Sequence, residues 1–251
     1  MTSPGFWRLR VHESLGSTSD LCRSLAQAGE TEGLAILALR QEGGRASHGR
    51  SWASPPGNMY LSVLLRPAGP VRLGGNWSLL AAVALADTVA PMLPPHATLS
   101  LKWPNDLMLN GAKLAGILLD SNADANGNFT SLVIGIGLNL ATAPKLADRP
   151  TACIADLATP PTPEAAVGAL LDRLDHWRHA GFDAVRQAWL TRAQPVGSDI
   201  ELMQGERTIT GTFAGLGGDG SLLLTTDGRV HAYAAGEVRQ RIGVGSPLAR
   251  V

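Results

Sequence analysis

Apolar residues along this 251-residue chain follow two spacings, one typical of strands and the other of amphipathic helices. Short continuous or alternating apolar runs predict strands over residues 6–11, 34–39, 59–65, 99–103, 107–109, 114–120 and 131–140. Helical spacing with capping and stop signals predicts helices over residues 17–28, 77–92, 163–178 and 182–191. Because strands dominate and no strand–helix–strand unit repeats, the pattern predicts an α+β fold, a mixed sheet with helices packed on it.

The pattern changes after Pro195. Short β runs over residues 200–203, 209–213, 221–225 and 230–233 are separated by turn signals such as Asp227-Gly228. Closely spaced short strands of this kind suggest a small barrel, so we expect two domains, residues 1–193 and 194–251. Residues 215–220 fit the nucleotide motif GxGxxG, but an apolar β run follows them. Without a helix N-terminus to receive a phosphate, this segment is predicted to be a hairpin turn.

Composition narrows the function classes. Hydrophobic residues make up 45% of the chain, and 21 Lys+Arg balance 21 Asp+Glu, which excludes a disordered chain and a globally basic nucleic-acid binder. Cys22 and Cys153 lack CxxC spacing and are predicted to be small buried residues. The N-terminus has no apolar run of signal-peptide length, and Asp87 and Pro91 interrupt the longest apolar stretch. We therefore expect a soluble, cytoplasmic protein in which any anion site is local.

A long polar segment, residues 41–58, interrupts the predicted strands; we call it the glycine/arginine loop. Loops of this length inside a compact domain are usually functional or disordered. Its glycines allow the backbone to approach a ligand closely, and Arg45 and Arg50 offer forked donors suited to carboxylate and phosphate. Trp52 could stack on a planar ring. The alternative is a solvated surface loop that Trp52 anchors to the core.

Two of the three lysines lie about one predicted hairpin apart, in the segments 102–106 (Lys-Trp-Pro-Asn-Asp) and 113–116 (Lys-Leu-Ala-Gly). A lysine is a compact charge able to neutralise a phosphate or carboxylate, and Asp106 could hold Mg²⁺ or orient an amine. Taken singly, Asp106 could equally cap a turn, and Lys102 could pair with a neighbouring carboxylate.

The predicted strand over residues 131–140 contains Gly135, Gly137 and Asn139. Small residues on one strand face leave room for a flat ligand, and an asparagine can recognise an amide or an adenine edge. Tight packing of the sheet would use the same glycines.

Taken in order, six segments resemble those of biotin–protein ligases: Ser17-Thr18, the glycine/arginine loop up to Trp52, Ser54-Pro55-Pro56-Gly57-Asn58, Lys102-Trp103-Pro104-Asn105-Asp106, Lys113-Leu114-Ala115-Gly116 and Gly135-Ile136-Gly137-Leu138-Asn139. The resemblance spans roughly residues 11–140. It implies a mixed-sheet catalytic domain of the biotin/lipoate ligase type, which is class II synthetase-like, followed by a small C-terminal SH3-like β-barrel.

The resemblance also implies a reaction. Biotin and Mg-ATP give biotinyl-5′-adenylate and pyrophosphate, and a lysine of the biotin carboxyl carrier protein of acetyl-CoA carboxylase then attacks the acyl carbon. Because two anions must meet in the first step, Lys113, Arg45 and Arg50 are the candidate catalytic cations. Asp106 matches an aspartate thought to assist the amine or the metal. The loop would close over biotin and exclude water from the adenylate.

The same resemblance assigns further ligand contacts by position. It implies biotin contacts at Ser17, Thr18, Gln41, Arg45, Lys113 and Gly116, and adenine contacts at Trp52 and Asn139. Other positions expected in the ligand site are Ser19, Ala46, Ser47, Gly135 and Gly137. The six histidines show no metal motif, so no resident metal site is expected.

Two positions depart from the family pattern. Ser47 stands where the loop usually carries a second arginine, so Lys102, His48 or Arg50 would have to supply that charge, or the adenylate would be held less tightly. Ser19 stands where an asparagine is common, and its hydroxyl could keep one hydrogen bond.

The predicted first strand begins by about residue 6, before which the winged helix-turn-helix of some family members would not fit. We therefore expect a ligase that binds no sequence-specific DNA and no membrane. Two alternatives stay open: a lipoate–protein ligase, which also adenylates an acyl group, and a non-catalytic sensor of biotin or its adenylate. The segment 102–106 and the C-terminal β module favour biotin over lipoate.

Overall fold

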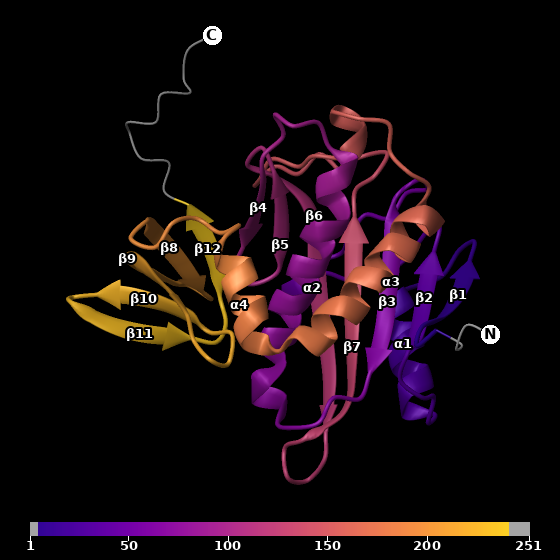
Figure 1. Cartoon of the computed structure of the whole chain (residues 1–251), viewed down its shortest axis with the longest axis horizontal. Helices are drawn as coiled ribbons and strands as arrows, with labels where there is room; N and C mark the ends of the chain where they lie inside the picture. The colour runs from indigo at the N-terminus through magenta and orange to yellow at the C-terminus, as the bar shows by residue number, and fades with distance from the viewer. Residues whose placement is uncertain (1–4, 241–251) are drawn as a thin grey trace.

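The computed structural model describes residues 5–240 and contains a seven-stranded mixed sheet in the order β1-β2-β3-β7-β6-β5-β4 (Figure 1). Strand β1 pairs with β2 in parallel, and the remaining neighbours pair antiparallel. The strands are β1 (Arg8–His12), β2 (Leu34–Ala38), β3 (Met59–Leu65), β4 (Leu99–Lys102), β5 (Asp106–Leu109), β6 (Ala112–Ala123) and β7 (Phe129–Leu138).

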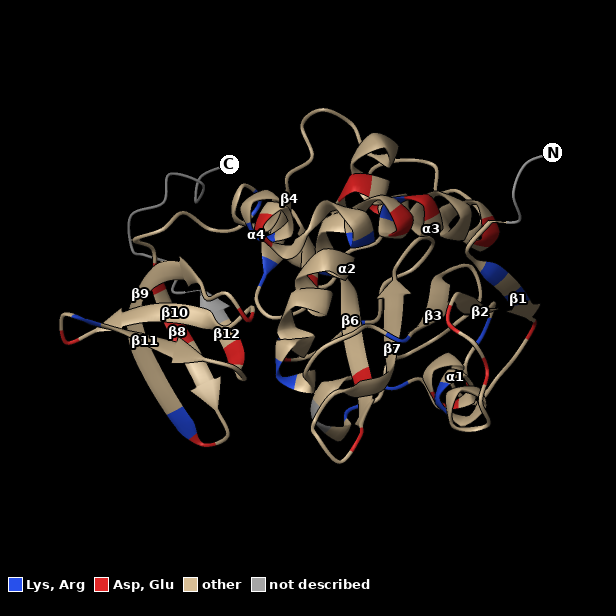
Figure 2. Cartoon of the chain, turned by 60° about the horizontal axis from the view of Figure 1, so that its bottom comes forward, with Lys and Arg blue, Asp and Glu red and all other residues tan. Residues whose placement is uncertain are grey.

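Helices cover both faces of this sheet. Helix α1 (Thr18–Gln27) lies on one face, and α2 (Gly74–Val89), α3 (Pro163–Ala180) and α4 (Phe182–Leu190) lie on the opposite side (Figure 2). Strand residues alternate accordingly: Leu34 and Ile36 pack with Cys22 of α1, while Ala35 and Leu37 join the larger core under α2 and α3. Short 3₁₀ turns complete the fold at Ser47–Gly49, Val71–Leu73, Ala90–Met92 and Ile154–Asp156.

Local capping explains where two helices begin. The Ser17 hydroxyl accepts a hydrogen bond from the Asp20 amide at 3.3 Å and so starts α1. The Thr162 hydroxyl caps α3 through the Ala165 amide, and Pro163 occupies the first turn, where its missing N–H is not needed. Both starts agree with the sequence prediction.

Helix α2 is apolar all round because it is the central core helix. The segment Val71–Met92 has the length and hydropathy of a membrane span, but 67% of its most apolar 18-residue window is buried. It packs on α3, α4 and β6. It begins three residues earlier than the sequence predicts and includes Gly75 in its first turn, where a Cβ would lie 2.8 Å from the Asp219 carbonyl oxygen.

A second, antiparallel sheet follows, in the order β11-β10-β9-β8-β12 (Figure 1). Its strands are β8 (Asp199–Gln204), β9 (Arg207–Leu216), β10 (Leu222–Thr226), β11 (Arg229–Tyr233) and β12 (Glu237–Gln240). The GxGxxG-like segment forms the end of β9 and the turn into β10, as predicted. Strand β12 is not predicted from the sequence, because Val238 is the only apolar residue in its four.

The two sheets share one apolar core. Phe213, Leu222 and Val238 of the second sheet belong to the same buried cluster as Leu101 and Trp189. Beside this core, the 217–220 turn contacts the start of α2, a contact we call the glycine seam. There the Trp103 indole N–H donates to the Gly220 carbonyl and the Asn76 amide donates to the Gly218 carbonyl, each at 3.0 Å.

The predicted fold class is thus confirmed as a mixed α+β sheet with helices, and the second sheet is consistent with an SH3-like module. Cys22 and Cys153 are buried and unpaired, as expected of small core residues. The division of the chain at residues 193 and 194 stays a prediction.

Candidate active site

A cavity of about 240 Å³ lies on the face of the seven-stranded sheet that carries α1. Its floor is formed by β3, β6 and β7, and the glycine/arginine loop and residues 144–151 form its walls. The floor is shallow because Gly116 and Gly137, which are paired across β6 and β7, both face this side. The cavity therefore collects residues from segments far apart in the sequence.

A continuous chain of hydroxyl and amide groups lies at the end of the cavity next to α1, where Thr18, Ser19 and Gln41 line it and Ser54 and Ser62 support them from behind. The Gln41 side-chain oxygen accepts from the Thr18 amide at 2.8 Å, and the Ser62 hydroxyl donates to the Thr18 hydroxyl at 2.8 Å. Ser19 Oγ and Ser62 Oγ lie 3.1 Å apart, and the Gln41 side-chain amide donates to Ser54 at 3.0 Å. Hydrogen-bond donors and acceptors held in place at this end of the cavity suit a small ligand that both donates and accepts hydrogen bonds.

The space above the floor glycines is occupied by protein side chains. A Cβ on Gly137 would lie 2.6 Å from the Trp52 ring, a Cβ on Gly116 would lie 3.0 Å from it, and a Cβ on Gly135 would lie 2.5 Å from Ser19 Oγ. The glycines thus allow the indole to lie close against the sheet. Trp52 lines the cavity, so its ring can provide a stacking surface for a flat ligand.

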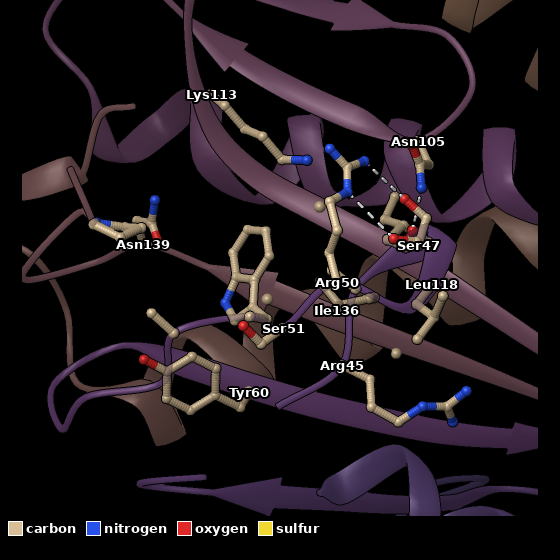
Figure 3. A pocket seen from close by; sticks show the side chains of 18 of the residues that line it. Arg45, Ser47, Arg50, Ser51, Tyr60, Asn105, Lys113, Leu118, Ile136 and Asn139 are labelled. Carbon is tan, nitrogen blue, oxygen red and sulfur yellow. Dashed lines mark hydrogen bonds between the residues drawn. The ribbon is translucent and has the colours of Figure 1, made fainter. Parts of the chain in front are cut away.

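Lys113 brings a cation into the cavity and pairs with Asp106. Its Nζ lies 2.5 Å from Asp106 Oδ1, with side-chain exposures of 16% and 9% for the two residues. The same ammonium group lies 5.5 Å from the centroid of the Trp52 ring. In Figure 3 the Lys113 amino group points toward Arg50. A half-buried cation held by one carboxylate is well placed to attract an anionic substrate group.

Arg50 lies close to Ser47. Arg50 Nε donates to the Ser47 carbonyl at 3.3 Å, and Nη2 lies 3.4 Å from the Ser47 hydroxyl (Figure 3). Arg50, one of the three residues considered as sources of the missing loop charge, therefore lies beside Ser47. The side chain of His48, another of them, lies outside the described part of the structure. The Lys102 side chain is not part of the cavity lining; burial lowers its pKa, while the charges of Asp106 and Glu237 oppose that shift.

The small sheet also contributes a charge near the cavity. Glu237 on β12 lies 2.9 Å from Arg149 and 3.4 Å from Arg50. Burial raises the pKa of Glu237, but the charges of Arg149 and Arg50 outweigh this and hold it below its ordinary value of 4.5. Arg149 also pairs with Asp148 at 2.6 Å. A carboxylate from the second sheet therefore bridges two arginines that line the cavity.

The Arg45 guanidinium points away from Lys113 and Arg50 (Figure 3). It forms a two-pronged contact with Asp120, at 2.8 and 3.3 Å, and a further contact with Asp20 at 3.1 Å. Both carboxylates lie outside the cavity lining, which Arg45 itself joins. Arg45 is therefore held by two aspartates instead of facing the other cations.

Asn139 is fixed on the opposite wall. Its side-chain amide donates to the Ala152 carbonyl at 3.0 Å, and its backbone bonds to Leu114 and Ile154. Within the described part of the chain, the buried Asn139 Oδ1 and the buried Trp52 Nε1 have no hydrogen-bond partner. Buried polar atoms are normally satisfied, so an acceptor and a donor left open beside one cavity point to a ligand that supplies both.

The structure brings most of the predicted site residues together around this cavity: Thr18, Ser19, Gln41, Arg45, Ala46, Ser47, Arg50, Trp52, Lys113, Gly116, Gly135, Gly137 and Asn139. Two lie outside its lining. Ser17 caps α1, and Asp106 acts on the cavity through Lys113.

Several cavity residues were missed by sequence reasoning. Tyr60 lies on the predicted strand over residues 59–65 and Asn105 lies within the segment 102–106, although neither was assigned to the site. Asp148 and Arg149 belong to no motif, because the segment over residues 141–152 has no regular periodicity and its prolines indicate only a loop.

No group of three or more His, Cys, Asp or Glu residues able to hold a metal occurs within residues 5–240. Mg²⁺ commonly binds through substrate phosphates and one or two carboxylates. Here Asp106 and Asp148 are the carboxylates at the cavity, and each is engaged by a cation. This donor set fits an ion that arrives with a nucleotide better than a resident metal.

Comparisons with known proteins agree with this arrangement. Residues 11–139 match the model of the biotin/lipoate A/B protein ligase family. The chain is 35% identical over 218 residues to the biotin–[acetyl-CoA-carboxylase] ligase of Paracoccus denitrificans, covering 81% of this chain and 88% of that protein.

Two solved structures extend the comparison. The biotin protein ligase of Aquifex aeolicus in complex with biotin and ATP aligns with a TM-score of 0.76 and 24% identity, over 92% of this chain and 97% of that one. The biotin protein ligase of Leishmania major in complex with biotinyl-5-AMP aligns with a TM-score of 0.64 and 26% identity, over 90% and 98%. The chain therefore belongs to the biotin/lipoate A/B protein ligase family.

Proposed function

We propose that this protein uses ATP to attach biotin to a lysine of a biotin carboxyl carrier protein domain through biotinyl-5′-adenylate. One observation carries the proposal: a single cavity joins the hydroxyl–amide chain around Thr18 to Lys113 and to the open polar atoms of Trp52 and Asn139. The first element suits the ureido ring of biotin, and the last suits adenine. Lys113 lines the same cavity, with its Nζ 5.5 Å from the centroid of the Trp52 ring, and we expect the carboxylate and the α-phosphate to meet beside it.

In the first step, a carboxylate oxygen of biotin forms a bond to the α-phosphorus of ATP, and the bond to the β-phosphate breaks to release pyrophosphate. Both reactants are anions, so positioned cations lower the barrier. We assign this work to Lys113, which faces the cavity, and to Arg50 beside Ser47. Mg²⁺ bound to the phosphates would supply further charge neutralisation.

In the second step, the amine of the acceptor lysine attacks the acyl carbon, and the bond from that carbon to the phosphate oxygen breaks to release AMP. The amine must lose a proton as it attacks. Asp106, which is buried and next to Lys113, is our candidate for orienting that amine. The glycine/arginine loop, through Trp52 and the segment 45–47, excludes water from the mixed anhydride in the meantime.

The test is to incubate the protein with ATP, Mg²⁺, labelled biotin or labelled lipoate, and apo carrier domains for each. Label on the biotin carrier, with pyrophosphate released before transfer, supports the proposal. Label on the lipoyl carrier alone would identify a lipoate ligase, and binding of biotin without any transfer would identify a sensor. A cytoplasmic location and the lack of sequence-specific DNA binding stay predictions, the latter tested by a gel shift on a biotin-operon fragment.

A further inference from the structure

The glycine/arginine loop is folded into a small hairpin. The Trp52 amide donates to the Gly44 carbonyl at 2.8 Å, and the Ala46 amide donates to the Arg50 carbonyl at 2.9 Å. Arg45 and Ser51 form a bridge between the two arms, and Ser47–Gly49 form a 3₁₀ turn at the tip. Both arms line the cavity, so the position of this hairpin decides how well the cavity is covered.

Arg45 ties one arm of the hairpin to the domain beneath it. Its two contacts to Asp120 reach β6, and its contact to Asp20 reaches the first turn of α1. These are the two elements that carry Gly116 and Thr18 into the cavity wall. The guanidinium therefore connects the covering loop to both sides of the site it covers.

The pair of Arg45 and Asp120 is two-pronged and partly exposed. The side chains of Arg45 and Asp120 are 34% and 22% exposed, and the contact uses both carboxylate oxygens. Planar two-pronged pairs of this kind fix direction as well as distance. Asp20 is 46% exposed and shared with Arg23 at 2.9 Å, so Asp120 is the more restrictive partner.

We propose that Asp120, assisted by Asp20, is a positioning residue that holds the glycine/arginine loop over the ligand through Arg45. The proposal rests on the proposed function only for the identity of the ligand. Asp120 touches neither substrate nor reacting atoms; it limits how often the hairpin lifts. Weakening the contact between Asp120 and Arg45 should speed the release of the adenylate while leaving the rate of adenylate formation nearly unchanged.

The experiment compares Asp120→Asn with the wild-type chain in two measurements. Amide hydrogen exchange of Ala46 and Trp52 is followed without any ligand, and release of biotinyl-5′-adenylate is followed without an acceptor. Because exposed or half-buried ion pairs contribute modestly, we expect exchange and release to rise roughly two- to fivefold. Arg45→Gln should raise amide exchange by the same factor, and the double variant should raise exchange no more than either single variant does.

Two control variants separate the proposal from a general loss of structure. Arg23→Gln removes the other cation from Asp20 without touching the loop, and Asp120→Glu keeps the charge; both should behave like the wild type within about twofold. Unchanged exchange and release in Asp120→Asn would overturn the proposal, as would additive effects in the double variant. If the wild-type protein makes no adenylate, the proposed function fails, yet the exchange measurement still tests the positioning role.

Discussion

Lys113 offers the sharpest test of the proposed chemistry, because its removal should affect stability and catalysis by separable routes. Its Nζ lies 2.5 Å from Asp106 Oδ1, and the two side chains are 16% and 9% exposed. Lys113→Met keeps the aliphatic stem that packs near Gly116, where a Cβ would lie 3.3 Å from the lysine Cε. The substitution therefore removes the charge with little loss of packing.

The stability cost follows from the carboxylate left behind. Removing one partner of a buried ion pair typically costs about 3–5 kcal/mol. Asp106 retains Lys102 as a cross-strand neighbour and the pair is only partly buried, so we expect a smaller cost, about 2–3 kcal/mol. For a chain of this size that corresponds to a melting temperature lower by about 4–12 °C. Adding Asp106→Asn removes the unpaired charge and should recover most of the loss.

The catalytic cost should not be recovered in the same way. Losing one preorganised charge at a developing anion typically lowers kcat by about 10²–10³-fold. We therefore expect biotin-dependent pyrophosphate release to fall by at least about a hundredfold in Lys113→Met and to stay low in the double variant. Normal pyrophosphate release from folded Lys113→Met would refute the role of the cation. A double variant as unstable as the single one would refute the stability reasoning.

Three further predictions concern other parts of the site. Gly137→Ala would place a Cβ 2.7 Å from Trp52 Nε1 and displace the indole ring. Because stacking on that ring would be lost, the KM for ATP should rise about five- to fiftyfold while the affinity for biotin changes little. An unaltered KM for ATP would contradict this prediction. Ser62→Ala removes the hydroxyl that links Thr18 and Ser19, so calorimetry should show an affinity for biotin about five- to thirtyfold weaker. An affinity equal to that of the wild type would contradict a role of this hydroxyl chain in biotin binding. Glu237→Gln should lower stability by about 0.5–1 kcal/mol at neutral pH. Because the folded pKa of Glu237 lies below 4.5, this difference should persist above 4.5 and vanish as the pH falls through the folded value. A melting-temperature difference that does not shrink as the pH is lowered below 4.5 would contradict the assignment.

Sequence reasoning succeeded where a local signal decides the outcome. The predicted strand over residues 59–65 matches β3, and α3 begins at Pro163 as expected. It also found the cavity residues that lie in glycine-rich or lysine-bearing segments. These features depend on periodicity, capping and close backbone approach, all of which are encoded within a few neighbouring residues.

It failed where a residue's role is set by a distant partner. No local pattern indicates that Asp120, 75 positions away, holds the Arg45 guanidinium. The catalytic role of Arg45 stays a prediction. Strand β12 depends on pairing with β8, and Arg149 reaches the cavity from a segment without any pattern. Gly75 lies inside α2, where glycine is unfavourable, because the 217–220 turn approaches its backbone too closely for a Cβ. Such placements require the tertiary fold and cannot be read from local spacing.

The glycine seam has a consequence for how the two sheets can be recombined. A Cβ on Gly220 would lie 2.7 Å from the Gly75 carbonyl carbon, and a Cβ on Gly75 would lie 2.8 Å from the Asp219 oxygen, so main chain meets main chain there. Main-chain contact leaves no side chain that could adjust to a new neighbour. A C-terminal module grafted from a relative would dock only if it brought a matching turn with a residue as small as glycine. The module is therefore specific to its host and not portable, and Glu237 reaches Arg149 and Arg50 because that docking is fixed.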